Sequence, residues 1–500
     1  MLKIEEMAAF CKKKGFVYRS SDIYGGYSGF FDFGPLGTEM FNSLKADWWK
    51  YFVQNNGNMV GIDASIISHP KTWEASGHLD SFGDLLLVCS KCKEKLRADH
   101  FIEDELDTVA DGLDIPAINA LIEKHKLVCP KCKNKFQELK DFNLLFPTKI
   151  GASEDSKSDS YLRGETAQGI FMDFKQIADT SRMKLPFGIA QIGRCFRNEI
   201  SPRDFLFRCR EFHIGEFEFF IHPDEKKCPE LTKEHLNLKL KVLTAETQDK
   251  GKKDLIDMTI KEMLKKKKLG EWHAYWLAEQ YFWLLSIGLS AKNLKVREHV
   301  NTELSHYSSA TLDFDYQFPF GSKEISGNAN RGQYDLNQHM KHSKQKLELF
   351  DEESKTKVIP RVIEPTFGME RIFMALLYEA YQDDKERGNV VLKLHPKLAP
   401  IKVVILPLVN KIADKGKKVY DSLRKEFVTS YDKSGSVGRR YARADEQGIP
   451  YCVTVDFDEG VTIRDRDSTK QIRVDEKELV VVLGQLLEGK IKFEKAGKLI

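Results

Sequence analysis

Two stretches that lie far apart in the chain constrain its fold more than any other feature. Residues 191–200 and 207–212 show apolar alternation on either side of a polar loop, which predicts two antiparallel strands joined as a hairpin. This hairpin places Arg197, Glu199 and Phe212 on a sheet surface that is rigid enough to hold a ligand. Residues 362–381 run from another strand into a long apolar helix, with Arg371 in its first turn. The two patterns together predict an antiparallel sheet with charged side chains beside the start of a helix.

The length of the chain and a change of pattern near residue 396 indicate several domains. A chain of 500 residues exceeds what one hydrophobic core usually organises. A proline-containing linker at 395–400 precedes strands that alternate with helices, so residues 396–500 are predicted to form a small α/β domain. Within the first 395 residues, 85–145 is interpreted as a compact insertion and 222–310 as a mainly helical, lysine-rich insertion.

The cysteines favour a metal site over a disulfide framework. The chain has nine cysteines, an odd number, and four of them form two CxxC pairs with 36 residues between the pairs. The four thiolates of Cys89, Cys92, Cys129 and Cys132 suit a structural Zn²⁺, which prefers tetrahedral sulfur ligands. The alternative is a degenerate knuckle that has lost its metal. Four thiolates leave no open position on the ion, so we expect this metal to be structural and not catalytic.

Charge and hydropathy narrow the class of protein. The net charge is only +3, so any contact with nucleic acid must come from local basic patches. No apolar run approaches the length of a membrane span, and the first residues carry acids in place of the apolar core of a secretory signal. The cysteine pattern, which favours a metal site over disulfides, indicates a reducing compartment. We therefore expect a soluble cytoplasmic protein with no membrane association.

The two stretches described first resemble motifs 2 and 3 of the class II aminoacyl-tRNA synthetases. Further strings along almost the whole chain are similar to signatures of glycyl-tRNA synthetases of the homodimeric type. They include Trp73-Glu-Ala-Ser-Gly-His78, Glu165-Thr-Ala-Gln-Gly169, Phe196-Arg-Asn-Glu-Ile-Ser-Pro-Arg203 and Ser434-Gly-Ser-Val-Gly-Arg-Arg-Tyr441. The resemblance implies an α+β fold in which residues 1–395 form the catalytic domain, an antiparallel sheet flanked by helices. It also makes 85–145 a zinc-knuckle-like insertion and 396–500 the anticodon-binding domain.

The resemblance implies a ligase that joins glycine to tRNA with ATP and Mg²⁺. Arg197, Glu199 and Arg371 would be the catalytic residues: Arg197 would grip the α-phosphate, Glu199 would accept from the adenine amino group, and Arg371 would cover the adenine face opposite Phe212. Arg208 would hold the γ-phosphate and Glu324 would ligate Mg²⁺. The full ATP site would comprise Arg197, Asn198, Glu199, Phe207, Arg208, Cys209, Phe212, Glu324, Ile325 and Arg371.

Glycine has no side chain, so a pocket must hold it by its ammonium group and reject larger amino acids by size. The resemblance places Glu165, Glu216, Glu364 and Thr366 around that ammonium. Steric exclusion of larger side chains requires no editing domain, and no segment of the chain is left over for one.

The partners implied by the resemblance are tRNA(Gly), glycine, ATP and a second copy of the chain. Residues 20–60 resemble the motif that forms the dimer interface in this family. In the C-terminal domain, Arg439, Arg440, Tyr441 and Arg443 are the candidate tRNA contacts, because arginine and tyrosine suit unstacked RNA bases. Side synthesis of diadenosine tetraphosphate is a property of the family that the residues leave open.

Two other readings compete with this one. The first is a non-catalytic, synthetase-like dimer that binds nucleic acid as an accessory factor; retention of Arg197, Glu199, Glu324 and Arg371 speaks against it. The second is a class II synthetase for threonine, proline, serine or histidine. The three pocket glutamates and the string that begins at Glu165 favour glycine over these.

Overall fold

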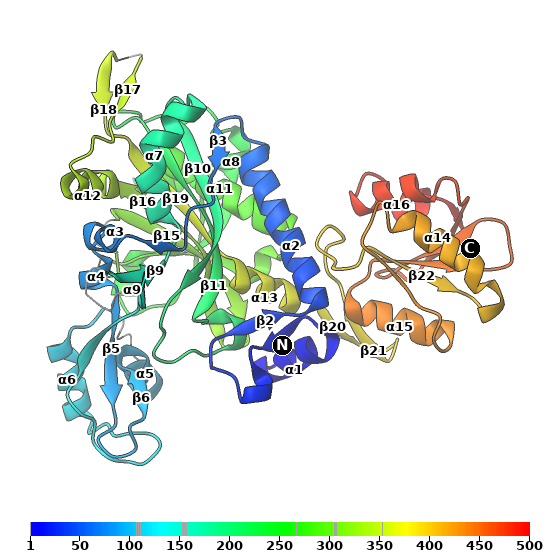
Figure 1. Ribbon diagram of the computed structural model, residues 1–500, viewed down its shortest axis with the longest axis horizontal. Helices are drawn as coiled ribbons and strands as arrows, with labels where there is room; N and C mark the ends of the chain where they lie inside the picture. Colours follow the sequence, from blue (N-terminus) through cyan, green and yellow to red (C-terminus); the bar gives the residue numbers. More distant parts are fainter. Residues whose placement is uncertain are drawn as a thin grey trace.

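The structure, a computed structural model, describes residues 2–500 apart from 107, 109, 111, 153–157, 267, 302, 305–307 and 353. A large body holds most of the chain, and a smaller unit that contains the C-terminus stands to one side of it (Figure 1). A third, small lobe projects from the other end of the body and carries strands β5 and β6 with helices α5 and α6 (Figure 1).

The body is organised around a nine-stranded sheet in the order β13-β12-β14-β15-β16-β19-β11-β10-β3. Neighbouring strands are antiparallel except in the pairs β12–β14 and β10–β3. Its long central strands are β10 (Phe187–Phe196), β11 (Glu211–Ile221), β15 (Ala310–Phe318), β16 (Gly321–Gly332) and β19 (Arg361–Gly368), and β3 (Met59–Gly61) forms one edge. The predicted hairpin is therefore present as β10 and β11, which pair from Phe187↔Phe220 to Phe196↔Glu211.

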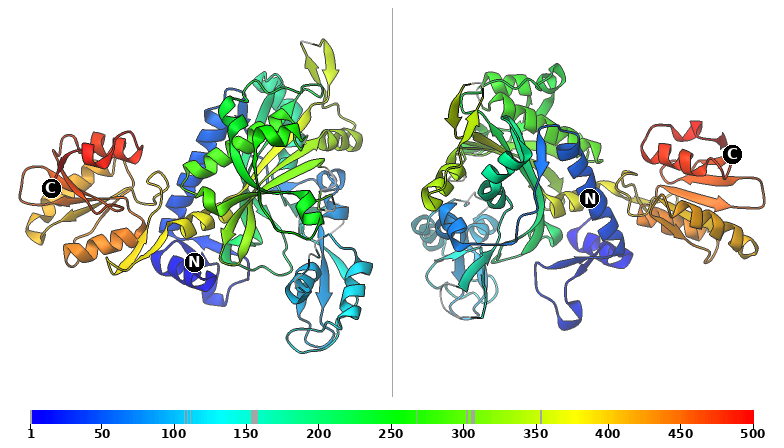
Figure 2. Two further views of the ribbon diagram at one scale, coloured as in Figure 1. Left: turned by 180° about the vertical axis from the view of Figure 1, so that it is seen from behind. Right: turned by 45° about the horizontal axis from the view of Figure 1, so that its top comes forward.

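Helices cover both faces of this sheet (Figure 2). One face packs on α2 (Pro35–Trp49), α11 (Glu271–Ser286) and α13 (Met369–Ala380), and the other on α7 (Ala167–Ser181) and α12 (Tyr334–Ser343). Period-two alternation in β11 explains the division, because Phe217 and Phe219 belong to the core under the first group of helices and Phe220 to the core under the second. Helix α11 is buried nearly all round, which accounts for its aromatic composition.

The start of α2 is fixed by a close approach of two backbones. Helix α1 (Ile4–Lys14) and strand β1 (Val17–Arg19) precede it, and β1 pairs with β2 (Phe31–Phe33). A Cβ on Gly37 would lie 1.8 Å from the Phe16 carbonyl oxygen, so only glycine lets the first turn of α2 pack there. The N-terminal segment is thereby anchored on the large body.

The insertion at 222–310 differs from the expectation of a mainly helical segment. Besides α11 it contains the short helices α8 (Lys233–Asn237), α9 (Ala245–Asp249) and α10 (Ile260–Lys265), but also strands β12 (Lys239–Leu243), β13 (Ile256–Thr259) and β14 (Leu294–Glu298), which widen the main sheet. In β12 exposed lysines alternate with the buried residues Leu240 and Val242. The lysines obscured this strand pattern in the sequence.

The lobe formed by the first insertion is a small sheet covered by two helices. Strand β5 (Gly83–Val88) pairs with β6 (Lys95–Arg97) on one side and β7 (Lys140–Asn143) on the other. Helices α5 (Ala98–Leu106) and α6 (Ile115–Lys124) share a separate apolar core with this sheet. The lobe therefore has its own packing, and it also contacts the body through α5, where Asp104 lies 3.2 Å from Arg203.

The C-terminal unit is a six-stranded sheet in the order β23-β22-β24-β25-β26-β27, with its own core. The strands are β22 (Val403–Pro407), β23 (Thr429–Tyr431), β24 (Tyr451–Val455), β25 (Val461–Asp465), β26 (Gln471–Val474) and β27 (Lys498–Leu499). The helices are α14 (Ala413–Leu423), α15 (Val437–Gln447) and α16 (Leu479–Leu487). The ammonium of Lys402 donates to the carbonyl oxygens of Lys397 and Ala399, both at 2.8 Å, which fixes the path of the linker.

Candidate active site

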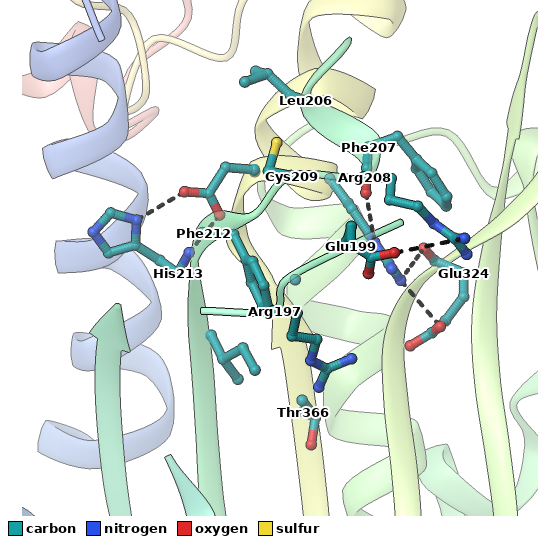
Figure 3. A pocket seen from close by; sticks show the side chains of 14 residues that line it. Arg197, Glu199, Leu206, Phe207, Arg208, Cys209, Phe212, His213, Glu324 and Thr366 are labelled. Carbon is teal, nitrogen blue, oxygen red and sulfur yellow. Dashed lines mark hydrogen bonds and ion pairs between the residues drawn. The ribbon is translucent and has the colours of Figure 1, made fainter. Parts of the chain in front are cut away.

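A cleft opens where the β10–β11 connection meets β16 and the beginning of α13 (Figure 3). Its lining side chains are mainly charged or aromatic. They include Arg197, Glu199, Phe207, Arg208, Cys209, Phe212, Glu324, Thr366 and Arg371. Most of the residues predicted for an ATP site therefore face one cleft, although they come from strands more than 100 residues apart in the chain.

Arg371 lies in the first turn of α13, directly after β19 delivers the chain to the cleft. Its guanidinium lies 4.5 Å from the centre of the Phe207 ring, and its Nε donates to the Phe207 carbonyl oxygen at 3.2 Å. Its Nη1 is 3.0 Å from a carboxylate oxygen of Glu324. The arginine is thus held by three contacts while about a quarter of its side chain, 26%, stays exposed to the cleft.

Arg197 faces the same cleft from the opposite wall. Its guanidinium lies over the Phe212 ring at 5.4 Å and over the Phe82 ring at 5.2 Å, and its Nε donates to the Gly164 carbonyl oxygen at 3.2 Å. A planar cation between two aromatic rings has little freedom to turn, so the remaining N–H groups point in a defined direction.

One detail of the hairpin differs from the prediction. Arg197 and Glu199 lie in the loop after β10 ends at Phe196, and only Phe212 lies on a strand. The Arg197 N–H still donates to the Arg210 carbonyl oxygen at 2.9 Å, so the antiparallel pairing continues into the loop. This pairing supplies the rigidity that the prediction assigned to the sheet itself.

Arg208 connects the cleft to the first insertion. Its Nη1 lies 3.8 Å from a carboxylate oxygen of Glu199 and 3.2 Å from the ring nitrogens of His100. Burial and the positive charge of Arg208 lower the pKa of His100 to about 3, so its imidazole is neutral and can accept a hydrogen bond. His100 was not among the predicted site residues. The insertion therefore takes part in shaping the cleft.

Two predicted ATP-site residues contribute no side chain to the cleft. Ile325 is fully buried in the main core, and Asn198 lies outside the lining, its N–H donating to the Leu144 carbonyl oxygen at 2.7 Å. Cys209 does line the cleft, with its thiol 3.7 Å from the Phe205 carbonyl oxygen. Only the main chain of Ile325 remains available to a nucleotide.

The carboxyl groups predicted for the glycine pocket meet next to the cleft, on the face of the sheet that α7 covers. Glu216 accepts from the Thr166 N–H at 2.7 Å and from the Thr366 hydroxyl at 3.4 Å. Glu165, at the entrance to α7, accepts from Gln168 at 2.9 Å and is paired with His78 at 3.3 Å. Glu364 is also buried. Because Thr366 also lines the cleft, the acidic pocket and the cleft are contiguous.

The structure adds two buried charged residues to this pocket that the sequence analysis missed. Arg331, on β16, donates to Glu364 at 2.8 Å and to Asp335 at 2.8 Å. Glu218 lies two positions after Glu216 on β11, so both side chains project from the same face. The spacing of two between Glu216 and Glu218 is the sequence signal that could have predicted Glu218 as a pocket residue. No pattern near Arg331 in the sequence predicts that it pairs with Glu364.

The four CxxC cysteines converge at the tip of the first insertion. Their sulfur atoms all lie within 4.8 Å of one another. The Sγ atoms of Cys89 and Cys132 are 3.3 Å apart, and those of Cys92 and Cys129 are 3.6 Å apart. Sulfurs at the corners of a tetrahedral zinc site stand about 3.8 Å apart, given Zn–S bonds of about 2.3 Å. The residues present therefore fit a structural metal ion.

The candidate tRNA contacts of the C-terminal domain separate into two kinds. Arg440 is buried, and its guanidinium donates to the carbonyl oxygens of Pro407 at 2.7 Å and Leu408 at 3.3 Å. The prediction that Arg440 contacts tRNA is therefore wrong, because this side chain ties α15 to the end of β22. Arg443 is partly engaged by Asp432 at 2.6 Å, and Tyr441 by Thr454 at 2.7 Å. Arg439 is exposed.

Comparison with known proteins defines first the class and then the family. The family model of the tRNA synthetase class II core domain (G, H, P, S and T) matches residues 148–381, and that of the anticodon binding domain matches residues 402–486. The fold resembles the crystal structure of prolyl-tRNA synthetase from Cryptosporidium parvum, complexed with halofuginone and AMPPNP, with a TM-score of 0.57. That match has 13% sequence identity and covers 97% of this chain and 75% of the other. The cleft and sheet are those of a class II tRNA synthetase core.

Curated relatives identify the family. The glycine–tRNA ligase of Caldanaerobacter subterraneus subsp. tengcongensis is 44% identical over 502 residues, covering 98% of this chain and 99% of the relative. That of Geobacillus thermodenitrificans is 42% identical and covers 98% of both chains. The chain belongs to the glycine–tRNA ligase family. The expected α+β fold, the class II core and the C-terminal anticodon-binding domain are confirmed.

Across the described parts of the chain, no helix combines the length and the apolar character needed to cross a lipid bilayer.

Proposed function

We propose that this protein activates glycine with ATP, releasing pyrophosphate, and transfers the glycyl group to the 3′ end of tRNA(Gly). One observation carries the proposal: Thr366 lines the cleft and also donates to Glu216 of the acidic pocket. An amino acid whose ammonium group is held in that pocket would therefore direct its carboxylate toward a nucleotide in the cleft. The family to which the chain belongs supports the same assignment.

The first step needs no nucleophile from the protein, since the carboxylate of glycine itself attacks the α-phosphate. We assign Arg197 to the α-phosphate and the attacking carboxylate, where a fixed guanidinium stabilises the charge that develops. Phe212 and Arg371 would cover the two faces of the adenine, and Glu199 would accept from its amino group. Arg208 would bind the γ-phosphate. These roles amount to positioning and charge stabilisation, which suffice for a phosphoryl-group displacement.

Glu324 is the residue that would hold the catalytic Mg²⁺. It offers a hard carboxylate oxygen at the edge of the cleft, 3.0 Å from the cation of Arg371, and 44% of its side chain is exposed. Bound Mg²⁺ would neutralise charge on the ATP phosphates. Glu324 would exchange its partner from the Arg371 guanidinium to the metal when nucleotide enters.

Glycine would be selected by size and by its ammonium group. The carboxylates of Glu165, Glu216 and Glu364 suit a cation, and Thr366 stands at the junction with the cleft. The three glutamates, on β11, on β19 and just before α7, are all buried. A site enclosed by them would have little space for a substituent on the α-carbon. Editing is unnecessary, because larger amino acids are excluded sterically.

The C-terminal unit, residues 396–500, would bind the anticodon, and residues 1–395 would carry the chemistry. Arg439 and Arg443 are the exposed arginines of α15, and because Arg443 is paired with Asp432, Arg439 is our first candidate for a base or phosphate contact. Tyr441 and Arg443 would contribute only if RNA displaced their present partners, Thr454 and Asp432.

The variants Arg440→Ala and Arg439→Ala should distinguish an arginine that stabilises the domain from one that binds RNA. Arg440→Ala removes the donors of buried carbonyl oxygens, so we expect a loss of about 1–3 kcal/mol in the unfolding free energy of the domain. Arg439→Ala should leave the unfolding free energy unchanged and weaken binding of tRNA(Gly). Thermal melts and filter binding measure the two effects. Equal loss of stability in both variants would contradict the assignment.

A structural Zn²⁺ would be held by Cys89, Cys92, Cys129 and Cys132 and would fix the tip of the first insertion. We expect purified protein to hold about one zinc per chain, and Cys132→Ser to lose it. Because His100 and Arg208 link this insertion to the cleft, the variant should also show a raised KM for ATP. Elemental analysis and pyrophosphate exchange test both points. Cys228→Ser, at a cysteine outside the cluster, is the control and should keep the metal.

We also propose that the working unit is a homodimer in the cytoplasm. The N-terminal segment supports a dimer, because Ile23, Tyr24 and Tyr27 are 88%, 87% and 76% exposed and would be covered by a second copy. The reduced cysteine cluster suits a reducing compartment. Synthesis of diadenosine tetraphosphate would follow if a second ATP attacked the adenylate in place of tRNA.

Charging of a tRNA(Gly) transcript with radiolabelled glycine tests the proposed function. The full chain with ATP and Mg²⁺ should form acid-precipitable glycyl-tRNA, and omission of ATP should abolish it. Tight binding of tRNA without any charging would instead favour the accessory-factor reading.

A further inference from the structure

Glu218 is a buried acid that the mechanism above does not use. It lies on β11, is fully buried, and neither of its carboxylate oxygens has a hydrogen-bond partner among the described residues. Glu216, Glu218 and Glu364 each offer a carboxylate oxygen, and these atoms all lie within 4.8 Å of one another. An acid without a donor therefore stands inside the pocket proposed to bind the substrate ammonium.

The neighbouring carboxylates differ from Glu218 in that each has a donor suited to an anion. Glu216 accepts from the Thr166 N–H at 2.7 Å, and Glu364 accepts from Arg331 at 2.8 Å. Glu165 lies 3.7 Å from the same Arg331 guanidinium. The positive charge and the N–H donors of the pocket are thus committed to the other acids. If one carboxyl group of this cluster carries a proton, the hydrogen bonds assign that proton to Glu218.

The burial of Glu218 and the acids around it also favour its protonated form. Burial raises the pKa of Glu218 well above its usual range, and the negative charge of Glu364 raises it further. Glu216 on the same strand and Asp335 on α12 add to this effect, while Arg331 on β16 opposes it. Burial also raises the pKa of Glu364, to about 8. The single positive charge of Arg331 cannot balance the negative charges of all these acids if every one of them is ionised.

We propose that Glu218 is a neutral carboxylic acid in the working enzyme, a positioning residue whose single O–H donates to a carboxylate oxygen of one of its neighbours, Glu216 or Glu364. This hydrogen bond replaces a repulsion between neighbouring carboxylates and holds them where the ammonium of glycine enters. The proton stays on Glu218 throughout, so no bond is made or broken at this residue. The inference rests on the proposed function, because it deepens the assignment of the ammonium pocket.

A divalent cation bound by the three carboxylates is the competing explanation. It requires Glu218 to be ionised, since a carboxylate, not a carboxylic acid, ligates Mg²⁺ or Mn²⁺. The two explanations make opposite predictions for an uncharged residue that can still donate a hydrogen bond.

Kinetics of Glu218→Gln and Glu218→Met distinguish them. Glutamine is neutral and keeps a donor, so kcat/KM for glycine in pyrophosphate exchange should stay within about threefold of wild type. Methionine has a similar length but no donor, and it should raise KM for glycine about tenfold, the equivalent of one hydrogen bond, with KM for ATP unchanged. Glu379→Gln, at a partly buried acid that already accepts from Asn293, is the control for replacing a glutamate outside the pocket and should keep the wild-type KM for glycine. Equal losses in Glu218→Gln and Glu218→Met would overturn the proposal.

Thermal stability tests the protonation state without any substrate. An unfolded chain releases the proton of Glu218 above about pH 4.3, whereas the folded wild type keeps it, so wild type loses stability as pH rises from 5 to 8. The Glu218→Gln variant escapes this loss. Its Tm should match that of wild type near pH 5 and exceed it by a margin that widens toward pH 8.

A margin that stays constant between pH 6 and pH 8 would contradict a neutral Glu218. A rise in the wild-type Tm on addition of Mg²⁺ or Mn²⁺, absent in Glu218→Gln, would assign the three acids to a cation and likewise overturn the proposal. Failure of wild type to activate glycine would refute the proposed function, while the dependence of Tm on pH would still decide the state of Glu218.

Discussion

Replacing Arg371 by alanine will lower kcat/KM for ATP in glycine-dependent pyrophosphate exchange by about 10³, while the protein stays folded. Arg371 is the cation at the start of α13 that contacts both Phe207 and Glu324 in the cleft. Its removal takes away one face of the adenine site and a charge that faces the phosphates. Neither loss disturbs a buried core, because the side chain is partly exposed to the cleft.

Two variants control this result. Arg371→Lys keeps the charge but not the planar group, so it should recover only a small part of the lost activity. Arg194→Ala removes an arginine from neighbouring strand β10 whose side chain is 56% exposed, and it should leave the exchange rate unchanged. If Arg371→Ala exchanged pyrophosphate at the wild-type rate, Arg371 would not be part of the ATP site. The assignment of the first turn of α13 to ATP binding would then be wrong.

Replacing Arg331 by methionine will lower the unfolding free energy by about 3–5 kcal/mol and abolish glycine activation. Only 1% of the Arg331 side chain is exposed, and its guanidinium is paired with Asp335 and Glu364 and lies near Glu165. The substitution leaves buried carboxylates without their cation, which costs more than the pair itself contributed. Protonation of these acids at lower pH should restore part of the stability.

Urea unfolding at pH 7 and pH 5 measures this effect. Arg424→Met is the matched control, because Arg424 is 57% exposed and its contacts, an ion pair with Asp421 and the Tyr420 ring at 5.7 Å, lie at the surface, so no measurable change is expected. A stability of Arg331→Met equal to wild type at pH 7 would mean that the pocket acids are already neutral, against the charge distribution proposed for the pocket.

The parts of the fold that could be predicted from sequence are those with a strong local period. The alternation in 191–212 and the apolar run after Gly368 indicated β10, β11 and α13 directly, since each pattern is complete within one segment. The strands β12 and β14 were missed because lysines and other charges fill their exposed face. The partners that bury their other face come from distant parts of the chain.

The candidate site could be predicted only where a motif carried it. Arg197, Glu199 and Arg371 stand in recognisable strings, and the structure brings them to one cleft. Arg331 and Glu218 stand in strands that look like ordinary charged strands, and their burial depends on α7 and α12 packing across them. Arg440 shows the reverse error: an arginine on a polar helix resembles a solvated or RNA-binding side chain until its carbonyl partners are known.

Amino-acid-dependent ATP–pyrophosphate exchange with the purified full chain, measured separately for all twenty amino acids, tests the central claim most directly. Our account predicts exchange with glycine alone, because the pocket binds an ammonium beside the nucleotide cleft and excludes larger side chains. Exchange with threonine, proline, serine or histidine, or no exchange by folded protein with ATP and Mg²⁺, would contradict it.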